Sequence, residues 1–227
     1  MRSHLDPIVK EWAGSFLLDI SPSGSFAKGT ANKSGTDVDL FIPLSPNTKE
    51  TLKEIYDKLF DRMQQKGLNP GRQNVSIKVE VNGYSVDLVP GKRHNLFGLD
   101  DSLYRRRADT WTKTNVTTHI AHIKAGGRTQ ETRIVKLWRD QKKHDFPSFY
   151  LELAVLRAFA AAGRGTLATN VRTVFDFLGN GFADARIVDP ANTNNIVSDE
   201  LIAAERAKIV TAAKRALSAS TWQQIVV

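Results

Sequence analysis

Two aspartates separated by one residue, Asp37 and Asp39, are the side chains whose type and spacing most directly suggest chemistry. Side chains alternate between the two faces of a strand, which rises about 3.3 Å per residue, so both carboxylates share one face roughly 6.6 Å apart. Carboxylate oxygens can hold hard divalent cations, and two cations about 3.5–4 Å apart can activate a hydroxyl and stabilise a leaving phosphate. An isolated Asp-x-Asp pair is more often an exposed part of an edge strand, so the flanking residues must decide between the two interpretations.

A Gly-Ser pair, Gly24-Ser25, precedes the aspartates by eleven residues. Glycine permits a ligand to approach the backbone closely, and residues 25–30 are predicted to begin a short helix whose N-terminal amides point toward a phosphate. The apolar residues that alternate with the aspartates predict a core on the opposite face of their strand. An anion-binding turn followed by a metal-binding strand is the outline of a nucleoside triphosphate site.

A β-hairpin is predicted later in the first half of the chain. Apolar and polar residues alternate along 75–81, and Asn82-Gly83 is the strongest two-residue hairpin signal, so residues 84–89 form the return strand. A two-residue loop places Lys78 opposite Asp87. This register directs Asp87 to the polar face, away from the predicted core.

The hairpin leaves two interpretations of Asp87. Taken alone, it is a cross-strand partner of Lys78. If its strand lies beside the strand that carries Asp37 and Asp39, three carboxylates meet on one face and would neutralise two Mg²⁺ ions and a bound triphosphate. The presence of the aspartate pair favours the second interpretation.

The composition indicates a globular chain with a preference for anionic ligands. The sequence has 227 residues and no cysteine, which excludes disulfides and thiolate zinc sites. It contains no Walker A motif, no apolar run long enough to span a membrane and no signal sequence, so we expect a cytoplasmic protein. The net charge of +8 favours nucleotides or nucleic acids as ligands, although a basic surface that serves only solubility is an equal alternative.

The other predicted elements are mostly helices. Apolar residues at helical spacing predict helices over 48–66, 128–141, 147–162 and 199–218. Residues 93–118 are polar and irregular in pattern. They are either a solvated linker or a basic rim for a polyphosphate or nucleic acid.

These motifs together carry a resemblance. Gly-Ser, eleven residues and then Asp37-Val38-Asp39 resemble the signature of the polymerase-beta-type nucleotidyltransferase superfamily. The wider wording, SGSFAKGTA followed by DVDLFI, is most similar to the bacterial cGAS/DncV-like nucleotidyltransferases, which are related to oligoadenylate synthetases and archaeal CCA-adding enzymes. The resemblance implies an α+β fold, with a polymerase-beta-like palm of mixed sheet and helices over residues 1–95. A helical lobe over residues 96–227 would complete the nucleotide cleft.

The resemblance also implies roles for individual residues. In the family, a lysine and a serine on two helices contact the triphosphate and a following aromatic stacks on the base, and IVKLW and PSFYLE match those helices. The residues expected to be catalytic and to bind metal are Asp37, Asp39 and Asp87. Those expected to bind nucleotide are Gly24, Ser25, Lys136, Ser148 and Phe149.

The function implied is a magnesium-dependent nucleotidyltransferase, with Mn²⁺ as an alternative to its two Mg²⁺ ions. It would join NTPs, with ATP expected among them, into cyclic or linear oligonucleotide second messengers of the anti-phage signalling type. A template-independent RNA terminal transferase of the CCA-adding or poly(A) type is one alternative, and a non-catalytic nucleotide-binding relative is another. We expect an activating protein or RNA as a partner, and no membrane.

Overall fold

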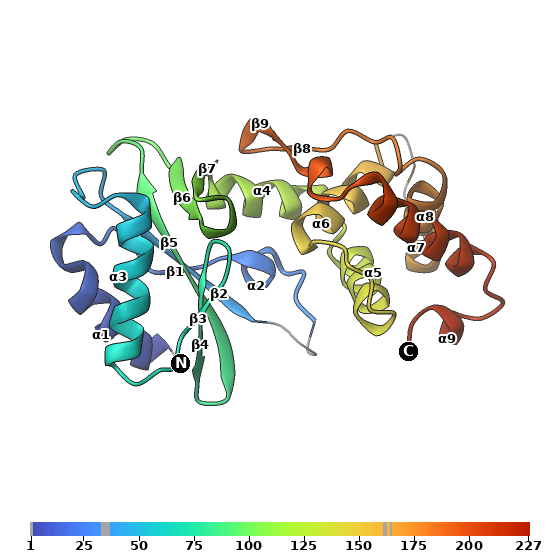
Figure 1. The fold of residues 1–227 in the computed structure, drawn as a ribbon. Coiled ribbons are helices and arrows are strands. Elements are labelled where there is room, and N and C mark those ends of the chain that lie inside the picture. The colour runs from blue at the N-terminus through green and yellow to red at the C-terminus, as the bar shows by residue number, and fades with distance from the viewer. Residues whose placement is uncertain (1, 33–36, 161–162, 164) are drawn as a thin grey trace. The chain divides into compact units, whose positions relative to one another are not determined.

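The computed structural model describes residues 2–32, 37–160, 163 and 165–227, which form two compact units (Figure 1). Unit 1 comprises residues 1–28 and 33–120, and unit 2 comprises residues 29–32 and 121–227. Helix α4 (Val116–Gly126) contains the boundary between them.

The boundary at 120/121 lies later in the chain than the predicted one at 95/96. Residues 93–118, whose pattern looked irregular and was interpreted as either a linker or a basic rim, extend the sheet of unit 1 as β6 (Asp101–Arg105) and β7 (Thr110–Thr114). The charged residues of this segment made it look exposed in the sequence, but two of them form an ion pair within the fold. Asp101 is buried, and Arg93 Nε donates to its carboxylate at 2.9 Å.

Unit 1 is a mixed sheet covered by helices, which confirms the predicted α+β class. Its remaining strands are β1 (Ser21–Pro22), β2 (Val38–Leu44), β3 (Gly71–Arg72), β4 (Ile77–Val81) and β5 (Tyr84–Arg93). The strand order is β1-β2-β5-β4-β3, and β6 pairs with both β5 and β7. The central pair, β2 and β5, is parallel, while the other pairs are antiparallel.

Two helices cover one face of this sheet. Helix α1 (Arg2–Ala13) and helix α3 (Leu52–Gln65) lie side by side (Figure 1) and pack apolar residues against those of β2, β4 and β5. Thr51 starts α3 with a capping box, in which its hydroxyl accepts from the Glu54 amide at 3.2 Å and Glu54 accepts from the Thr51 amide at 2.8 Å. The opposite face of the sheet is therefore free of this core.

The predicted hairpin register is confirmed. Lys78 pairs with Asp87 across β4 and β5. Asn82 and Gly83 have φ values of 53° and 76°, as a two-residue type I′ turn requires. Ahead of the Gly-Ser turn, the described residues contribute to the sheet only through one bridge at Leu17 and the two-residue β1.

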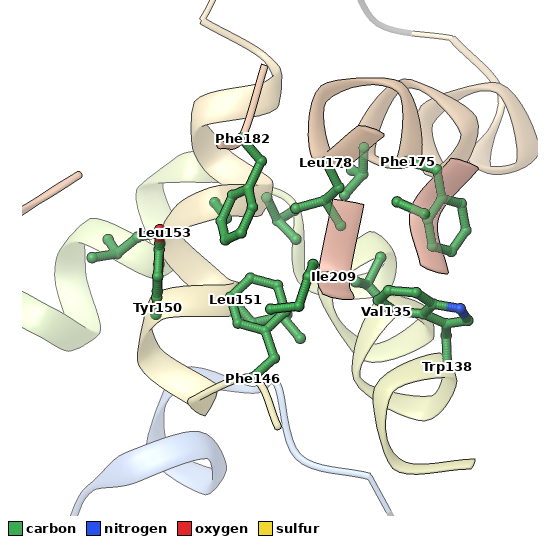
Figure 2. Close-up of a cluster of buried hydrophobic side chains, with 14 of the residues drawn as sticks. Val135, Trp138, Phe146, Tyr150, Leu151, Leu153, Phe175, Leu178, Phe182 and Ile209 are labelled. Atoms are coloured by element: carbon green, nitrogen blue, oxygen red, sulfur yellow. The ribbon is translucent and has the colours of Figure 1, made fainter. Parts of the chain in front are cut away.

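The described residues of unit 2 are mostly helical, with one hairpin. Its elements after α4 are α5 (Thr129–Gln141), α6 (Ser148–Ala158), α7 (Leu167–Asn180), β8 (Val188–Asp189), β9 (Asn192–Ile196), α8 (Ala203–Leu217) and α9 (Trp222–Ile225). Aromatic rings fill its core (Figure 2). The ring centroids of Phe146, Tyr150 and Phe182 lie 5.2–5.3 Å apart, and those of Trp138 and Phe175 lie 5.1 Å apart. No helix among the described residues is long and apolar enough to cross a membrane.

Candidate active site

The parallel pairing of β2 and β5 brings the predicted acids to adjacent strands. Asp39 and Asp87 are direct register partners, and neighbouring strands lie about 4.8 Å apart. Because residues 38, 40, 86 and 88 belong to the core, the alternating side chains of Asp37, Asp39 and Asp87 project from the other face. The structure therefore places all three on one face of one sheet. We call these three residues the carboxylate row.

The three carboxylates of the carboxylate row repel one another electrostatically. The pKa of Asp87 is raised from 3.8 to about 6, chiefly by burial and then by the negative charges of Asp39 and Asp37. Asp87 is 8% exposed, and Gln73 Nε2 donates to its Oδ1 at 3.1 Å. Lys78 and a hydrogen bond from Ser76 lower the pKa of Asp87, but less than burial raises it. A divalent cation is the kind of ligand that relieves such repulsion.

The absence of a side chain at Gly24 leaves room for the carboxylate of Asp39. The φ of Gly24 is +55°, a conformation that glycine adopts without steric cost, and a Cβ at this position would lie 1.7 Å from Asp39 Oδ2. The Asp39 carbonyl also accepts a hydrogen bond from the Ser23 amide at 2.8 Å. The Gly-Ser turn and the aspartate strand thus meet in space, as their shared motif predicts. Ser25 follows in the first turn of the five-residue helix α2 (Gly24–Lys28).

Asp37 is held by a lysine. Lys78 Nζ donates to both of its carboxylate oxygens, at 3.1 and 3.3 Å. Among the described residues, no three acidic or histidine side chains are grouped as a ready metal site. The row nevertheless fits hard cations in donor type, since all its ligands are carboxylate oxygens.

Lys136 lies on helix α5, as expected, and its side chain is engaged in a buried ion pair. Its ammonium is buried within unit 2, where Nζ lies 2.6 Å from Glu152 Oε1 and 3.2 Å from Thr30 Oγ1. The Thr30 hydroxyl donates to the same Glu152 oxygen at 2.5 Å. A triphosphate contact by Lys136 stays a prediction, and it would require the ammonium to leave a buried carboxylate.

Ser148 and Phe149 begin helix α6, as the sequence indicates. Ser148 is exposed and its hydroxyl accepts from Arg139 Nη1 at 2.7 Å. Phe149 is half-buried and packs against the core of unit 2. Their nucleotide contacts remain predictions.

Sequence reasoning missed several polar residues around these sites. Gln73 and Ser76 support Asp87 from the start of the hairpin, and Ser76 Oγ donates to Gln73 Oε1 at 3.2 Å. Gln73 belongs to a polar stretch that precedes the hairpin, and Ser76 is one of the polar residues that alternate along 75–81. Glu152 was hidden inside an apolar helical run, where an acid without a partner would be costly.

Comparison with known proteins agrees with this geometry. Residues 5–109 match the nucleotidyltransferase domain family. Over 163 residues the chain is 29% identical to the cyclic AMP-AMP-AMP synthase of Escherichia coli (strain MS 115-1), an alignment that spans 66% of this chain and 51% of that relative. The chain therefore spans about half the length of this curated relative.

Solved structures share the fold over almost the whole chain. The E. coli MS115-1 CdnC structure with ATP matches with a TM-score of 0.79 at 23% identity, covering 99% of this chain and 87% of that one. The Bradyrhizobium diazoefficiens CD-NTase CdnG with GTP gives 0.74 at 14% identity, covering 98% and 87%. Vibrio cholerae DncV, a cyclic AMP-GMP synthase, gives 0.67 at 14% identity, covering 88% and 62%.

These matches describe the class that the chain resembles. Residues 5–109 are similar to the nucleotidyltransferase domain family, and the chain has the fold of the cGAS/DncV-like nucleotidyltransferases, the CD-NTases. The resemblance read from the sequence is confirmed.

Proposed function

We propose that this protein is a metal-dependent nucleotidyltransferase that joins NTPs into a cyclic or linear oligonucleotide signal and releases pyrophosphate. The observation that carries the proposal is the pairing of Asp39 with Asp87 across β2 and β5, with Asp37 on the same face and Gly24 against Asp39. This combination joins an acidic row to a glycine turn of the phosphate-binding type. The reaction class is in-line attack of a ribose hydroxyl on an α-phosphate.

The carboxylate row would hold two divalent ions. When bound, Mg²⁺ or Mn²⁺ would offset the charge of the triphosphate and activate the attacking hydroxyl. Asp37, Asp39 and Asp87 would supply the ligands, and Asp87 would also help to accept the proton of the hydroxyl. Gly24 and Ser25 would bind phosphate through the backbone of α2. Ser148 and Phe149 are proposed to contact the nucleotide from α6.

The product class rests on the relatives. The E. coli relative is named a cyclic AMP-AMP-AMP synthase, and the V. cholerae one a cyclic AMP-GMP synthase. We infer a cyclic product from two or three nucleotides, with ATP among the substrates, and a role in anti-phage signalling in the cytoplasm. One E. coli CdnC structure is a complex with HORMA-deltaN, which supports an activating protein rather than an RNA as the expected partner.

One assay tests the proposal. Purified protein is incubated with Mg²⁺ or Mn²⁺ and labelled NTPs, with and without RNA. Small phosphatase-resistant products and pyrophosphate are expected. Labelled, extended RNA would indicate the terminal transferase alternative instead, and a failure to release pyrophosphate under every condition would leave a non-catalytic relative or a missing activator.

A double substitution tests the site. Asp37→Ala with Asp39→Ala should reduce pyrophosphate release by at least about a thousandfold, because metal and transition-state charge stabilisation are lost together. Far-UV circular dichroism should be unchanged. The matched control, Asp61→Ala with Asp145→Ala, removes two exposed acids and should retain activity. Undiminished turnover in the first variant would reject the carboxylate row as the active site.

A further inference from the structure

Lys78 reaches across the sheet to the carboxylate row. It lies on β4, opposite Asp87 of β5, which is in turn opposite Asp39 of β2. Its ammonium group donates to both carboxylate oxygens of Asp37, at 3.1 and 3.3 Å. The side chain therefore extends from β4 over β5 to the acid that precedes β2.

The Lys78 ammonium lies among acids that repel one another. Asp87 is buried beside Asp39 and Asp37, and Lys78 is the neighbour whose charge acts on it in the opposite direction. A positive charge at this place offsets part of the repulsion while no metal is bound. Lys78 thus stabilises the carboxylate row in the metal-free protein.

The ion pair between Lys78 and Asp37 can also break at little cost. The side chains of Lys78 and Asp37 are 40% and 35% exposed, and ion pairs with this much solvent access are weak. An ammonium on a flexible four-carbon chain can move to water at little cost. Asp37, however, cannot give both oxygens to metal ions while both remain bonded to Lys78.

We propose that Lys78 is a resident counter-ion of the carboxylate row, which holds Asp37 in the metal-free protein and releases it when a divalent cation binds. The inference rests on the proposed function for the presence of a metal site, but it concerns metal binding rather than turnover. Lys78 competes with the metal, so the apparent affinity is lower than that of the freed acids. The residue sets the divalent cation concentration at which the site fills.

The experiment measures Mn²⁺ binding without nucleotide, by isothermal titration calorimetry of the full chain. Lys78→Met should tighten the Kd by about threefold or more, the range that an exposed ion pair and the loss of one repelling charge imply. It should also lower the melting temperature in EDTA, and saturating Mn²⁺ should remove that deficit. Lys78→Gln is measured beside it, in case the apolar side chain perturbs folding, and should tighten the Kd in the same way.

Lys58→Met is the matched control. Lys58 lies on α3 in the same unit and pairs with Glu50 at 2.8 Å, so its removal takes away one charge and one exposed ion pair far along the sequence from the row. Its Kd for Mn²⁺ should equal that of the wild type. If Lys78→Met and Lys78→Gln bind Mn²⁺ no more tightly than Lys58→Met, the inference is overturned.

A second comparison separates this failure from failure of the proposed function. Asp39→Asn with Asp87→Asn should abolish Mn²⁺ binding. If binding survives in that variant, the metal is elsewhere, and both the proposed site and the role of Lys78 are overturned. If binding depends on the acids but not on Lys78, the proposed site stands and the counter-ion role alone is rejected.

Discussion

Two buried acids, Glu152 in unit 2 and Asp87 in unit 1, have opposite surroundings. In unit 2 the side chains of Lys136 and Glu152 are 4% and 1% exposed, and each charge is met by the other and by Thr30. In unit 1 Asp87 is also buried, but two of its charged neighbours are acids, and its pKa rises to about 6. Charges compensated within the fold indicate a structural role, whereas charges left in repulsion indicate a site for a ligand.

A second cluster in unit 2 follows the first pattern. Arg128 Nη1 lies 3.2 Å from Glu131 Oε1, which also accepts from Asn170 Nδ2 at 2.7 Å. The Arg128 guanidinium stacks over the Phe159 ring at 3.6 Å. The helical unit therefore pairs its buried ions repeatedly, and the carboxylate row of unit 1 differs from both of these clusters.

The largest effect is expected from breaking the compensated pair. Glu152→Ala would leave Lys136 as a buried charge without its carboxylate, which should cost about 3–5 kcal/mol of unfolding free energy. Urea denaturation followed by circular dichroism measures this loss. Replacing both partners, as Lys136→Met with Glu152→Leu, should restore most of the stability because no charge is left uncompensated. A loss below about 1 kcal/mol in Glu152→Ala would contradict the structural role.

A smaller effect, on activity rather than on folding, is expected from substituting Gly24, the glycine that contacts Asp39 of the carboxylate row. Gly24→Ala would push its Cβ into Asp39 Oδ2, and the flexible carboxylate would move aside. Pyrophosphate release should fall about a hundredfold, the usual result of a misplaced reacting group. Unfolding should change by only about 1–2 kcal/mol, the cost of a left-handed alanine.

Gly67→Ala is the control for this prediction. Gly67 has a φ of +75°, and a Cβ added there would meet no other atom within 4 Å. The variant should lose similar stability and keep full activity. Equal loss of activity in both variants would show that strain alone, and not the contact with Asp39, explains the effect.

The smallest effect is expected from Asp87→Asn, which removes the repulsion between Asp87 and the other two acids of the carboxylate row. Asp87 has a folded pKa of about 6, above its ordinary value of 3.8, so the folded state binds more protons between these values and loses stability as the pH rises through about 6. Asp87→Asn should therefore be more stable than wild type at pH 7.5 in EDTA, by about 1 kcal/mol after allowance for solvent screening. The difference should vanish below pH 4.

Melting temperatures across this pH range measure the difference. Asp61→Asn, on the exposed side of α3, should show no comparable gain at pH 7.5. If Asp87→Asn is destabilised at pH 7.5, the acid is compensated after all, and the contrast between Asp87 and the Lys136–Glu152 pair fails.

The direction of each side chain in the carboxylate row was predictable because its determinants are local. A strand has a side-chain period of two, and Asn82-Gly83 fixes the hairpin register, so Asp87 had to face away from the core. The adjacency of β5 and β2 was not local and came from the resemblance. The structure confirms both the register and the adjacency.

The partner of Lys136 was not predictable in the same way. Lys136 and Glu152 lie on separate helices, and Thr30 comes from more than a hundred residues earlier, so only tertiary packing brings them together. Strand β6 was missed for a related reason, since the internal pairing of Arg93 with Asp101 makes a mostly buried segment look solvated. Charges that neutralise one another inside a fold carry no signature in a single sequence.

The parallel pairing of β2 with β5 has one more consequence. Asp39 and Asp87 are neighbours because main-chain hydrogen bonds align their strands from Val38–Val86 through Leu44–Lys92. Their separation is thus set by the peptide backbone, and substitution of side chains leaves the backbone in place. Mutation can delete an acid from this pair, but it cannot readily re-space the pair, so the interval between the two positions persists while the side chains around them diverge.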